Sequence, residues 1–283
     1  MTYTGFDDFL ISAIKEDVGT GDVTTEATIP ADAEIEGKYI AKDDGVICGT
    51  DVCRRVFELV GGEFSLEFFV SDGDAVKRGD VIGKVSGNAR SVLTGERLGL
   101  NIMQHLSGIA TKTRYYVDII AGTGARIADT RKATPGMRVL EKYAVRVGGG
   151  YNHRMNLSDG VLIKDNHIVA AGGIKNAVAA AKRHAPHTLK IEVETENEDE
   201  IREALEAGAD IIMLDNMTLD KMAEAVKLIN RRAIVEASGN MGDKSDEELR
   251  KVALTGVDLI SIGALTHSVK AFDISLKFTI KTN

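Results

Sequence analysis

The segment from Arg126 to His167 concentrates positive charge within an acidic chain. It holds eight Lys or Arg and four Asp or Glu, a net charge of +4, so the remaining residues carry −12 in a chain whose total is −8. The eight cations are Arg126, Arg131, Lys132, Arg138, Lys142, Arg146, Arg154 and Lys164. Clustered ammonium and guanidinium groups bind carboxylates and phosphates, and the arginine fork fits a planar carboxylate. The segment therefore predicts a binding site for a small molecule with several negative charges.

Four of these cations follow an expected strand or a glycine triplet: Arg131, Lys132, Arg154 and Lys164. The triplet, residues 148–150, precedes His153 and allows the backbone to approach a ligand closely. For these four cations we expect a role in binding. Arg138, Lys142 and Arg146 are instead spaced four apart on one expected helix, and this spacing favours a solvated helix face.

Six short apolar runs, each ending in polar residues, follow residue 124. They are ARIADT, GVLIKDNH, LKIEVET, DIIMLDN, AIVEASGN and DLISIGALTHS, and helical stretches separate the last five. Asn197 and Ser245 can cap two of those helices, with Glu200 and Glu248 three residues further on. Strands that alternate with helices predict a parallel sheet. Because nearly every strand ends in polar side chains, we expect an incomplete α/β barrel whose active site lies at the carboxyl ends of the strands.

The first 110 residues have a different texture, in which short strands predominate. We expect a helix over 6–18, strands over 34–41, 46–48, 63–70 and 81–85, and a helix over 91–107. The segment VSDGDAVKRGDVIGKVSG resembles half of a lipoyl or biotinyl carrier domain, but it lacks the turn lysine that such carriers modify. We therefore predict a structural sheet here and no carrier arm.

Two carboxylates, Glu194 and Asp215, end consecutive expected strands. At the mouth of a barrel they could bind a divalent metal or ribose hydroxyls, or stabilise a developing cation. The alternative is that they pair with nearby Lys and Arg side chains. Glu192 lies two residues before Glu194 and shares its strand face, so spacing alone does not choose between them.

Two turns rich in small residues follow the last two expected strands. Late turns of such barrels bind phosphate through backbone N–H groups and a helix N-terminus. The candidate phosphate-binding residues are Ser238, Gly239, Asn240, Gly263 and Ala264.

The composition argues against several classes of protein. A net charge of −8 and a pI near 5.4 argue against a nucleic acid or an anionic membrane as the main partner. No stretch approaches the roughly 20 apolar residues of a membrane helix, and the N-terminus lacks the basic and apolar regions of a signal peptide. Cys48 and Cys53 show no metal-binding spacing, so we expect two buried or half-buried thiols in a reducing cytoplasm.

Several long motifs together resemble the quinolinate phosphoribosyltransferase family (nicotinate-nucleotide pyrophosphorylase, carboxylating). In chain order they are GDVTTEATIP, ERLGLNIMQHLSGIAT, DTRKATPGMRVLEKYAVRVGGGYNHR, LIKDNH, IEVE, LDNM, EASGN and GALTHS, and they span nearly the whole chain. The resemblance implies an N-terminal α/β sandwich domain over 1–110, joined by the tail 269–283. It implies an incomplete (β/α) barrel of the type II phosphoribosyltransferase kind over 111–268.

The resemblance also implies a reaction of NAD biosynthesis. Quinolinate and phosphoribosyl pyrophosphate would give nicotinate mononucleotide, pyrophosphate and CO2, with Mg2+ as cofactor. Loss of pyrophosphate builds oxocarbenium character on the ribose, which Glu194 and Asp215 could stabilise as fixed carboxylates. Decarboxylation would leave a carbanion on the ring carbon next to the new N-glycosidic bond, with the cationic ring nitrogen as the electron sink that stabilises it.

The family's functional residues carry over by motif. Those around quinolinate would be Arg97, Thr130, Arg131, Lys132, His153, Arg154 and Lys164. Those around the ribose and the 5′-phosphate would be Glu194, Asp215, Ser238, Gly239, Asn240, Ile262, Gly263, Ala264 and His267. The catalytic groups would be Lys132, Lys164, Glu194 and Asp215, and the last two would also meet the metal, directly or through water.

The resemblance implies a homodimer, with a higher oligomer left open. Arg97, in ERLGLN, would reach into the site of the neighbouring subunit. The stretch GNMGDKSDE after EAS looks longer than is usual in the family, and this leaves the role of Asn240 less firmly placed than that of Ser238.

Three alternatives stay open from the sequence. A molybdenum-transport-associated paralogue of the same fold tends to lose the lysine of LIKDNH, whereas Lys164 is present here. A nicotinate phosphoribosyltransferase would need fewer cations, because its substrate has one carboxylate. A non-catalytic anion-binding or carrier protein would not need carboxylates at the strand ends.

Overall fold

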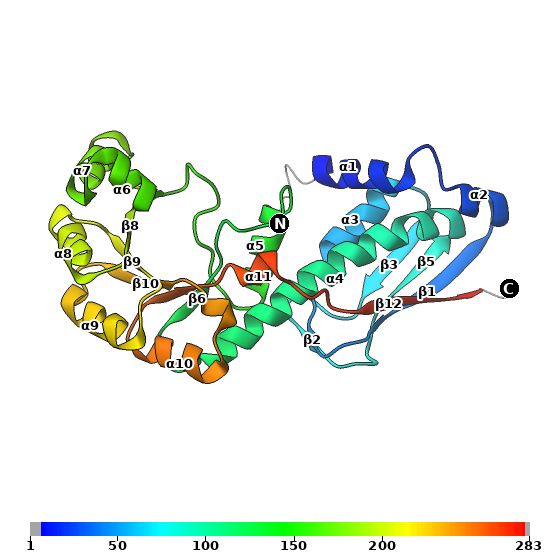
Figure 1. Ribbon diagram of the computed structural model, residues 1–283. Coiled ribbons are helices and arrows are strands. Elements are labelled where there is room, and N and C mark those ends of the chain that lie inside the picture. The colour runs from blue at the N-terminus through cyan, green and yellow to red at the C-terminus, as the bar shows by residue number, and fades with distance from the viewer. Residues whose placement is uncertain (1–6, 281–283) are drawn as a thin grey trace. The chain divides into compact units, whose positions relative to one another are not determined.

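The computed structural model describes residues 7–280, which divide into two compact units (Figure 1). The first consists of residues 7–112 and 269–280, and the second of residues 113–268. The mixed α/β architecture expected from the sequence is confirmed in both units.

The first unit is built on a four-stranded antiparallel sheet with the order β12-β1-β5-β3. Its strands are β1 (Glu34–Ala41), β3 (Phe64–Phe68), β5 (Val81–Asn88) and β12 (Ile274–Ile280). A ribbon of β2 (Gly45–Val46) and β4 (Ala75–Val76) accompanies it. The helices are α1 (Asp7–Val18), α2 (Val23–Thr28), α3 (Thr50–Val60) and α4 (Ala89–Ile119), the last of which continues into the second unit. The lipoyl-like segment supplies β4 and β5, so the prediction of a structural sheet is confirmed.

The core of this unit lies between the sheet and two helices. Tyr39 from β1 and Val85 from β5 pack in one cluster with Phe57 from α3 and Met103 from α4. The cluster is almost fully buried and supplies most of the hydrophobic stabilisation of the unit.

The helix α4 is longer than the expected helix over 91–107. Gly108 marks the expected end, but it serves packing instead: a Cβ atom there would lie 2.4 Å from the carbonyl oxygen of Lys270. Beyond it, Ile109, Ala110 and Tyr116 keep an apolar helical pattern and are buried. The helix therefore continues to Ile119.

The second unit is a six-stranded parallel sheet with the order β6-β11-β10-β9-β8-β7. The strands are β6 (Arg126–Ala128), β7 (Val161–Ile163), β8 (Ile191–Thr195), β9 (Ile211–Asp215), β10 (Ile234–Ser238) and β11 (Leu259–Ser261). In chain order β6 is the first of these strands and β11 the last, and the two pair with each other. The strands therefore follow the order of a closed barrel in which one pairing, between β6 and β7, is missing. The expected incomplete barrel of six strands is confirmed.

Helices connect and flank these strands. They are α5 (Arg138–Val147), α6 (Asp165–Ala171), α7 (Ile174–His184), α8 (Glu198–Ala207), α9 (Leu219–Ile229), the 3-10 helix η1 (Met241–Asp243), α10 (Asp246–Leu254) and α11 (Ala264–His267). In Figure 1, α7 to α10 run along the outside of β8, β9 and β10. The predicted caps are confirmed: the Asn197 side chain accepts from the Glu200 N–H, and Ser245 and Glu248 cap α10 reciprocally.

Residues 7–280 include both cysteines of the chain. Cys48 and Cys53 are free and buried, as predicted. None of the helices in this part of the chain is long and apolar enough to cross a membrane.

Candidate active site

Polar side chains gather at the carboxyl ends of the parallel strands. Asp129 follows β6, Lys164 follows β7, and Glu194 lies one residue before the end of β8. Asp215 and Ser238 end β9 and β10 and are register partners. The carboxyl ends of parallel strands meet at one edge of the sheet, so these residues share the edge where a barrel forms its active site.

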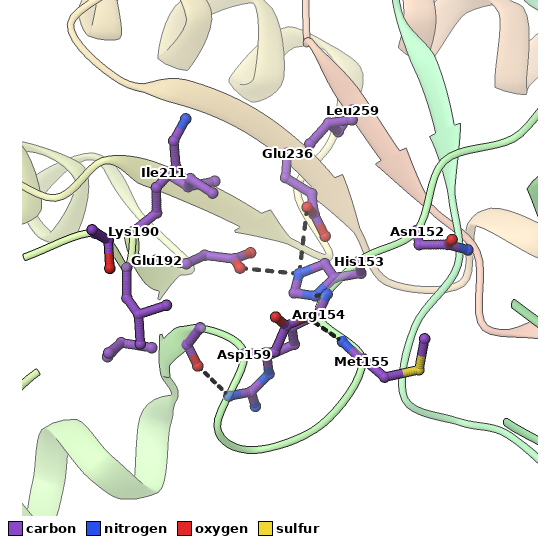
Figure 2. A pocket seen from close by; sticks show the side chains of 14 residues that line it. Asn152, His153, Arg154, Met155, Asp159, Lys190, Glu192, Ile211, Glu236 and Leu259 are labelled. Atoms are coloured by element: carbon purple, nitrogen blue, oxygen red, sulfur yellow. Dashed lines mark hydrogen bonds and ion pairs between the residues drawn. The ribbon is translucent and has the colours of Figure 1, made fainter. Parts of the chain in front are cut away.

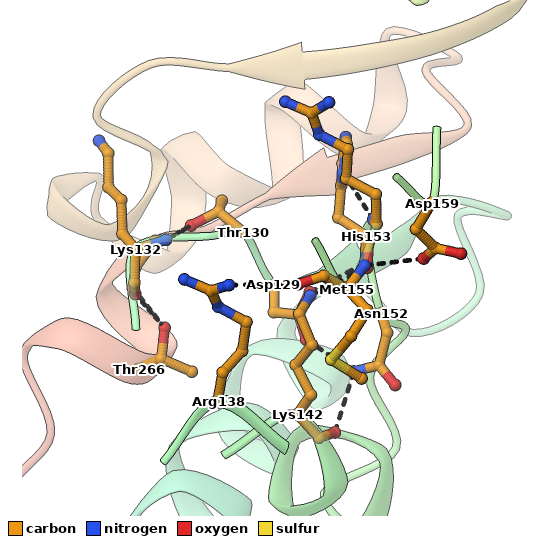
Figure 3. Close-up of polar contacts among 12 residues, drawn as sticks. Asp129, Thr130, Lys132, Arg138, Lys142, Asn152, His153, Met155, Asp159 and Thr266 are labelled. Carbon is orange, nitrogen blue, oxygen red and sulfur yellow. Dashed lines mark hydrogen bonds and ion pairs between the residues drawn. The ribbon is translucent and has the colours of Figure 1, made fainter. Parts of the chain in front are cut away.

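A buried ion pair underlies this edge (Figure 3). The Lys142 ammonium pairs with the Asp129 carboxylate, and their side chains are 1% and 0% exposed. Asn152 Nδ2 and the His153 N–H also donate to Asp129, at 2.6 and 2.8 Å. Burial raises the pKa of Asp129, while the charge of Lys142 and these donors oppose the rise. The expected solvated position of Lys142 is therefore wrong, because α5 turns this lysine toward Asp129.

The prediction of a solvated face on α5 fails at Arg138 as well. Its side chain is half-buried, donates to the Met155 carbonyl at 3.4 Å, and has a buried Nε without an acceptor among the described residues. Arg146 is exposed, but its guanidinium donates to the Gly150 carbonyl at 3.0 Å and lies 4.8 Å from the centre of the Tyr151 ring. These three cations organise the loop that follows the glycine triplet.

Two arginines of the predicted set form a cationic surface. Arg131 lines a cavity of about 390 Å³ together with Arg138. Arg154 is half-buried and donates to the Gly160 carbonyl at 2.9 Å, and its buried Nε has no acceptor within residues 7–280. Burial lowers the pKa of Arg154, and the charge of Arg131 lowers it further. The charge of Arg131 therefore acts on the Arg154 guanidinium, which places the two cations in the same part of the site.

His153 reaches into the barrel interior between two strands (Figure 2). Its Nε2 lies 3.0 Å from Glu192 Oε2 and 3.7 Å from Glu236 Oε2. Burial lowers the pKa of His153, but the hydrogen bond and charge of Glu192 and the charge of Glu236 outweigh it and raise the pKa overall. Burial and the charge of Glu192 raise the pKa of Glu236 to about 7.

Lys164 and Glu194 form an ion pair at the strand ends. Lys164 is half-buried at the N-cap of α6, and its backbone N–H donates to His167 Nδ1 at 2.9 Å. The alternative that a strand-end carboxylate pairs with a nearby lysine therefore holds for Glu194 in this structure. An incoming carboxylate has to compete with Glu194 for this ammonium.

The turns after β9 and β10 lie against each other. Asn216 donates from its backbone to the Ser238 carbonyl at 3.1 Å, and Asn240 Nδ2 lies 3.4 Å from Asn216 Oδ1. Gly239 has φ +90°, and a Cβ atom there would lie 2.2 Å from Asn216 Oδ1. Asp215 next to them is half-buried and accepts a hydrogen bond from Asn216 Nδ2 at 2.7 Å.

The last turn holds Lys132 against a glycine. A Cβ atom on Gly263 would lie 3.0 Å from Lys132 Cδ and 3.3 Å from the His267 ring. The hydroxyl of Thr266 donates to the Lys132 carbonyl at 2.5 Å, and the Lys132 N–H donates to Thr130 Oγ1 at 3.0 Å. The predicted Thr130, Lys132, Gly263 and His267 therefore form one cluster.

The loop after Asn240 folds onto the same turn. A Cβ atom on Gly242, in η1, would lie 2.8 Å from Ala264 Cβ and 3.3 Å from Ile262 Cγ2. Tyr116 fixes this loop by donating to the Gly242 carbonyl at 3.0 Å. The two late turns predicted to bind phosphate are thus adjacent.

Arg97 is exposed on α4 in the first unit, whereas every other predicted site residue belongs to the second. Its expected place in a partner's site stays a prediction.

Comparisons with known proteins match both units. Residues 22–107 match the quinolinate phosphoribosyl transferase N-terminal domain, and residues 109–277 match the C-terminal domain of that enzyme. The chain belongs to the quinolinate phosphoribosyl transferase family.

Individual relatives agree with this family over nearly their full length. The chain is 45% identical to a probable nicotinate-nucleotide pyrophosphorylase [carboxylating] of Bacillus subtilis, over 94% of this chain and 90% of the relative. It is 46% identical to the chloroplastic enzyme of that name from Arabidopsis thaliana, over 94% and 80%. The crystal structure of NadC from Streptococcus pyogenes superposes with a TM-score of 0.94 at 42% identity, covering 100% of this chain and 99% of that one.

Four buried residues of this family member were not predicted as site residues: Asp129, Lys142, Glu192 and Glu236. Only the alternation within β8 signalled Glu192, since it shares a face with Glu194. Glu236 stands in the middle of an apolar run, and a lone carboxylate at a buried strand position is itself a signal of a specific role.

The strand-end carboxylates of this quinolinate phosphoribosyl transferase fit Mg2+. Mg2+ is commonly held by one or two carboxylates together with substrate phosphates and water. Asp215 and Glu194 stand at the ends of adjacent strands, and the Asp215 carboxylate keeps lone pairs free beyond its bond with Asn216. These two residues could hold the ion directly or through water.

Proposed function

We propose that the chain acts as a decarboxylating quinolinate phosphoribosyltransferase in the de novo synthesis of NAD. It joins quinolinate to phosphoribosyl pyrophosphate and releases nicotinate mononucleotide, pyrophosphate and CO2. The observation that carries the proposal is the pairing of a cationic surface with carboxylates on one edge of the barrel. Relatives named for this reaction, at 45% and 46% identity, support it.

Arg131, Arg154 and Lys164 bind the two carboxylates of quinolinate, with Thr130 and His153 beside them. Arg154 donates through Nη1 to the Gly160 carbonyl, and its guanidinium has further N–H groups that can donate to a substrate carboxylate. Lys164 exchanges its partner Glu194 for the substrate. Arg97 of a second subunit completes this half in a homodimer.

The ribose and phosphate half lies at the adjacent strand ends. Glu194 and Asp215 face the ribose, and the two late turns bind the 5′-phosphate. These turn residues are Ser238, Gly239, Asn240, Ile262, Gly263 and Ala264, with His267 beside them. Backbone N–H groups in such turns suit phosphate oxygens. The resemblance placed Lys132 among the quinolinate contacts, but its side chain lies against Gly263 of the last turn, so we propose that it contacts the pyrophosphate instead.

The transfer breaks the bond from the anomeric carbon to pyrophosphate and forms the bond to the pyridine nitrogen. Glu194 and Asp215 stabilise the positive charge that develops on the ribose, and Lys132 stabilises the departing pyrophosphate. Mg2+, when bound, neutralises charge on the pyrophosphate. The C2 carboxylate then leaves as CO2, its bonding electrons stay on the ring carbon as a carbanion that the adjacent cationic ring nitrogen stabilises, and a proton adds to that carbon.

Substitution of two cations tests the assignment of the quinolinate half. We expect Arg131→Ala and Lys164→Ala to lower turnover with quinolinate by about 100-fold or more, because each removes a charge-assisted contact that orients the substrate. Lys175→Ala, which removes an exposed ion pair on α7, is the control and should leave turnover unchanged. Near-normal rates for both variants would defeat the assignment.

A further inference from the structure

Two buried carboxylates line a cavity inside the barrel together with His153 and Arg154. Glu192 on β8 and Glu236 on β10 are 4% and 1% exposed. The interior of such a barrel is usually filled by branched apolar side chains, and burying a carboxylate is costly unless it is paired. Negative charge also opposes anion binding nearby. A purely structural role would be served better by apolar side chains, so these two carboxylates call for another explanation.

The ring of His153 is their common partner, and its hydrogen bonds define its tautomer (Figure 2). Nε2 faces both carboxylates, at 3.0 Å from Glu192 and 3.7 Å from Glu236. Nδ1 accepts a hydrogen bond from the Arg154 backbone N–H at 2.8 Å. A ring nitrogen that accepts a hydrogen bond carries no proton, so the proton of the neutral ring resides on Nε2.

This tautomer argues against a metal ion bound by His153, Glu192 and Glu236. His153, Glu192 and Glu236 offer ligand atoms within 4.8 Å of one another, as a divalent cation requires. Metal binding needs a free lone pair on Nε2 and a proton on Nδ1. The Arg154 N–H occupies Nδ1 and imposes the opposite arrangement. The two carboxylates therefore act on a proton of the histidine.

The backbone of His153 is held as firmly as its ring. Its N–H donates to Asp129 at 2.8 Å, and its carbonyl accepts from Lys142 Nζ at 2.9 Å. Through Nδ1 the residue also holds the next peptide group, that of Arg154. The His153 ring therefore connects the backbone of Arg154, through Nδ1, to Glu192 and Glu236, which face Nε2.

We propose that Glu192 and Glu236 are positioning residues that keep the proton on His153 Nε2, so that Nδ1 fixes the backbone of Arg154. The inference deepens the proposed function and rests on it for the identity of the ligand. Glu192 forms the hydrogen bond, and a Glu236 oxygen lies beside the same nitrogen at 3.7 Å. Without Glu192 the ring can adopt the other tautomer, whose Nδ1–H would oppose the Arg154 N–H and displace its peptide group.

The tautomer can be measured independently of activity. Two-bond ¹H–¹⁵N correlation spectra of the histidine-labelled protein at pH 8 distinguish protonated from bare ring nitrogens, and His153→Asn identifies the signal. We expect protonated Nε2 and bare Nδ1 in the wild type and in Glu192→Gln, because the carboxamide oxygen still accepts. We expect that pattern to be lost in Glu192→Ala. A proton on Nδ1 in the wild type, or an unchanged ring in Glu192→Ala, would overturn the proposal.

Binding constants test the consequence for the pocket. We expect Glu192→Ala to raise the Kd for quinolinate by about tenfold and to change the KM for phosphoribosyl pyrophosphate by less than about threefold, since one charge-assisted contact is misplaced. Glu192→Gln should keep the Kd for quinolinate within about threefold of the wild type. Glu224→Gln, an exposed carboxylate on α9, controls for the loss of a charge elsewhere.

The outcomes separate this proposal from the proposed function. Equal losses in Glu192→Ala and Glu192→Gln, or an unchanged Kd in both, would refute the positioning role. A wild type that binds no quinolinate would refute the proposed function and leave the tautomer measurement standing. If Glu192→Ala does not fold, as circular dichroism would reveal, a proton on Nδ1 of His153 in the wild type or in Glu192→Gln would still overturn the proposal.

Discussion

Asp129 and Lys142 illustrate how burial changes the contribution of a charged side chain to stability. Each is almost completely removed from water, and each is the other's main electrostatic partner. A buried ion pair contributes little net stability compared with apolar side chains. The loss of one member, however, leaves the other as a buried charge without a counter-charge. The pair also anchors Asn152 and His153, so it holds the loop that carries the proposed quinolinate contacts.

Removal of Lys142 should therefore be costly. We expect Lys142→Met to lower the free energy of unfolding by about 3–5 kcal/mol, because Asp129 stays buried without a counter-charge. Urea unfolding measures this loss. Lys175→Met, which breaks an exposed pair with Glu206, should cost at most about 1 kcal/mol. Similar losses in the two variants would contradict the buried-pair interpretation.

Glu236 predicts a dependence of stability on pH. Its pKa is raised on folding to about 7, mainly because burial disfavours the charged form. The folded state therefore binds this proton more tightly than the unfolded state. The contribution to the free energy of unfolding then falls as pH rises from the ordinary range of a glutamate through about 7, by on the order of 3 kcal/mol.

Glu236→Gln should remove this dependence. Between pH 5.5 and pH 8, the wild type should lose stability relative to the variant, by roughly 1–3 kcal/mol in urea unfolding. Glu224→Gln, exposed on α9, should track the wild type at both values. A difference between Glu236→Gln and the wild type that does not change with pH would refute the raised pKa.

At the scale of elements, turns and caps place the site residues. The cap at Asn197 starts α8 soon after the end of β8, and the cap at Ser245 starts α10 after η1, which follows β10. The turns after β9 and β10 are locked together at Gly239, whose left-handed backbone approaches Asn216. This approach leaves no room for a side chain at position 239.

Gly239→Ala therefore tests the phosphate-binding turn. The added Cβ atom would meet Asn216 while the backbone is strained at φ +90°. We expect the KM for phosphoribosyl pyrophosphate to rise about tenfold or more, because the turn must shift. Gly122→Ala shares a positive φ of +80° but meets nothing within 4 Å, so it isolates the cost of strain. An equal effect of the two substitutions on KM would show that the close approach is irrelevant.

The elements were more predictable from sequence than the contacts were. Periodicity and caps identified the six barrel strands and the starts of α8 and α10, because these signals are local. The extent of α4 was missed because Gly108 packs against Lys270, far along the chain. The burial of Lys142 and Glu236 was missed for the same reason. The helical spacing around Lys142 and the apolar sequence around Glu236 do not show which charged residue pairs with a residue distant in the sequence.

At the scale of the whole molecule, the proposed role of Arg97 predicts a site shared between two subunits. It belongs to the first unit, and the other proposed contacts belong to the second. If two subunits exchange Arg97, an inactive Arg97→Ala dimer and an inactive Arg131→Ala dimer contain complementary defects. Each mixed dimer then has one site with both arginines intact.

Subunit mixing tests this arrangement. After equal amounts of the two variants are unfolded, refolded together and assayed, we expect about a quarter of the wild-type activity to return, because half of the dimers are mixed and each has one intact site of two. Refolding of each variant alone provides the control. If no activity returns although mixed dimers form, Arg97 acts within its own chain.

The central claim is that transfer and decarboxylation occur at one site, and the stoichiometry of CO2 tests it most directly. Quinolinate labelled in its C2 carboxylate is incubated with phosphoribosyl pyrophosphate, Mg2+ and the enzyme, and nicotinate replaces it in a parallel reaction. We expect one labelled CO2 for each mononucleotide formed from quinolinate, and no mononucleotide from nicotinate. Mononucleotide formed from nicotinate at a similar rate, or formed from quinolinate without release of labelled CO2, would contradict the claim.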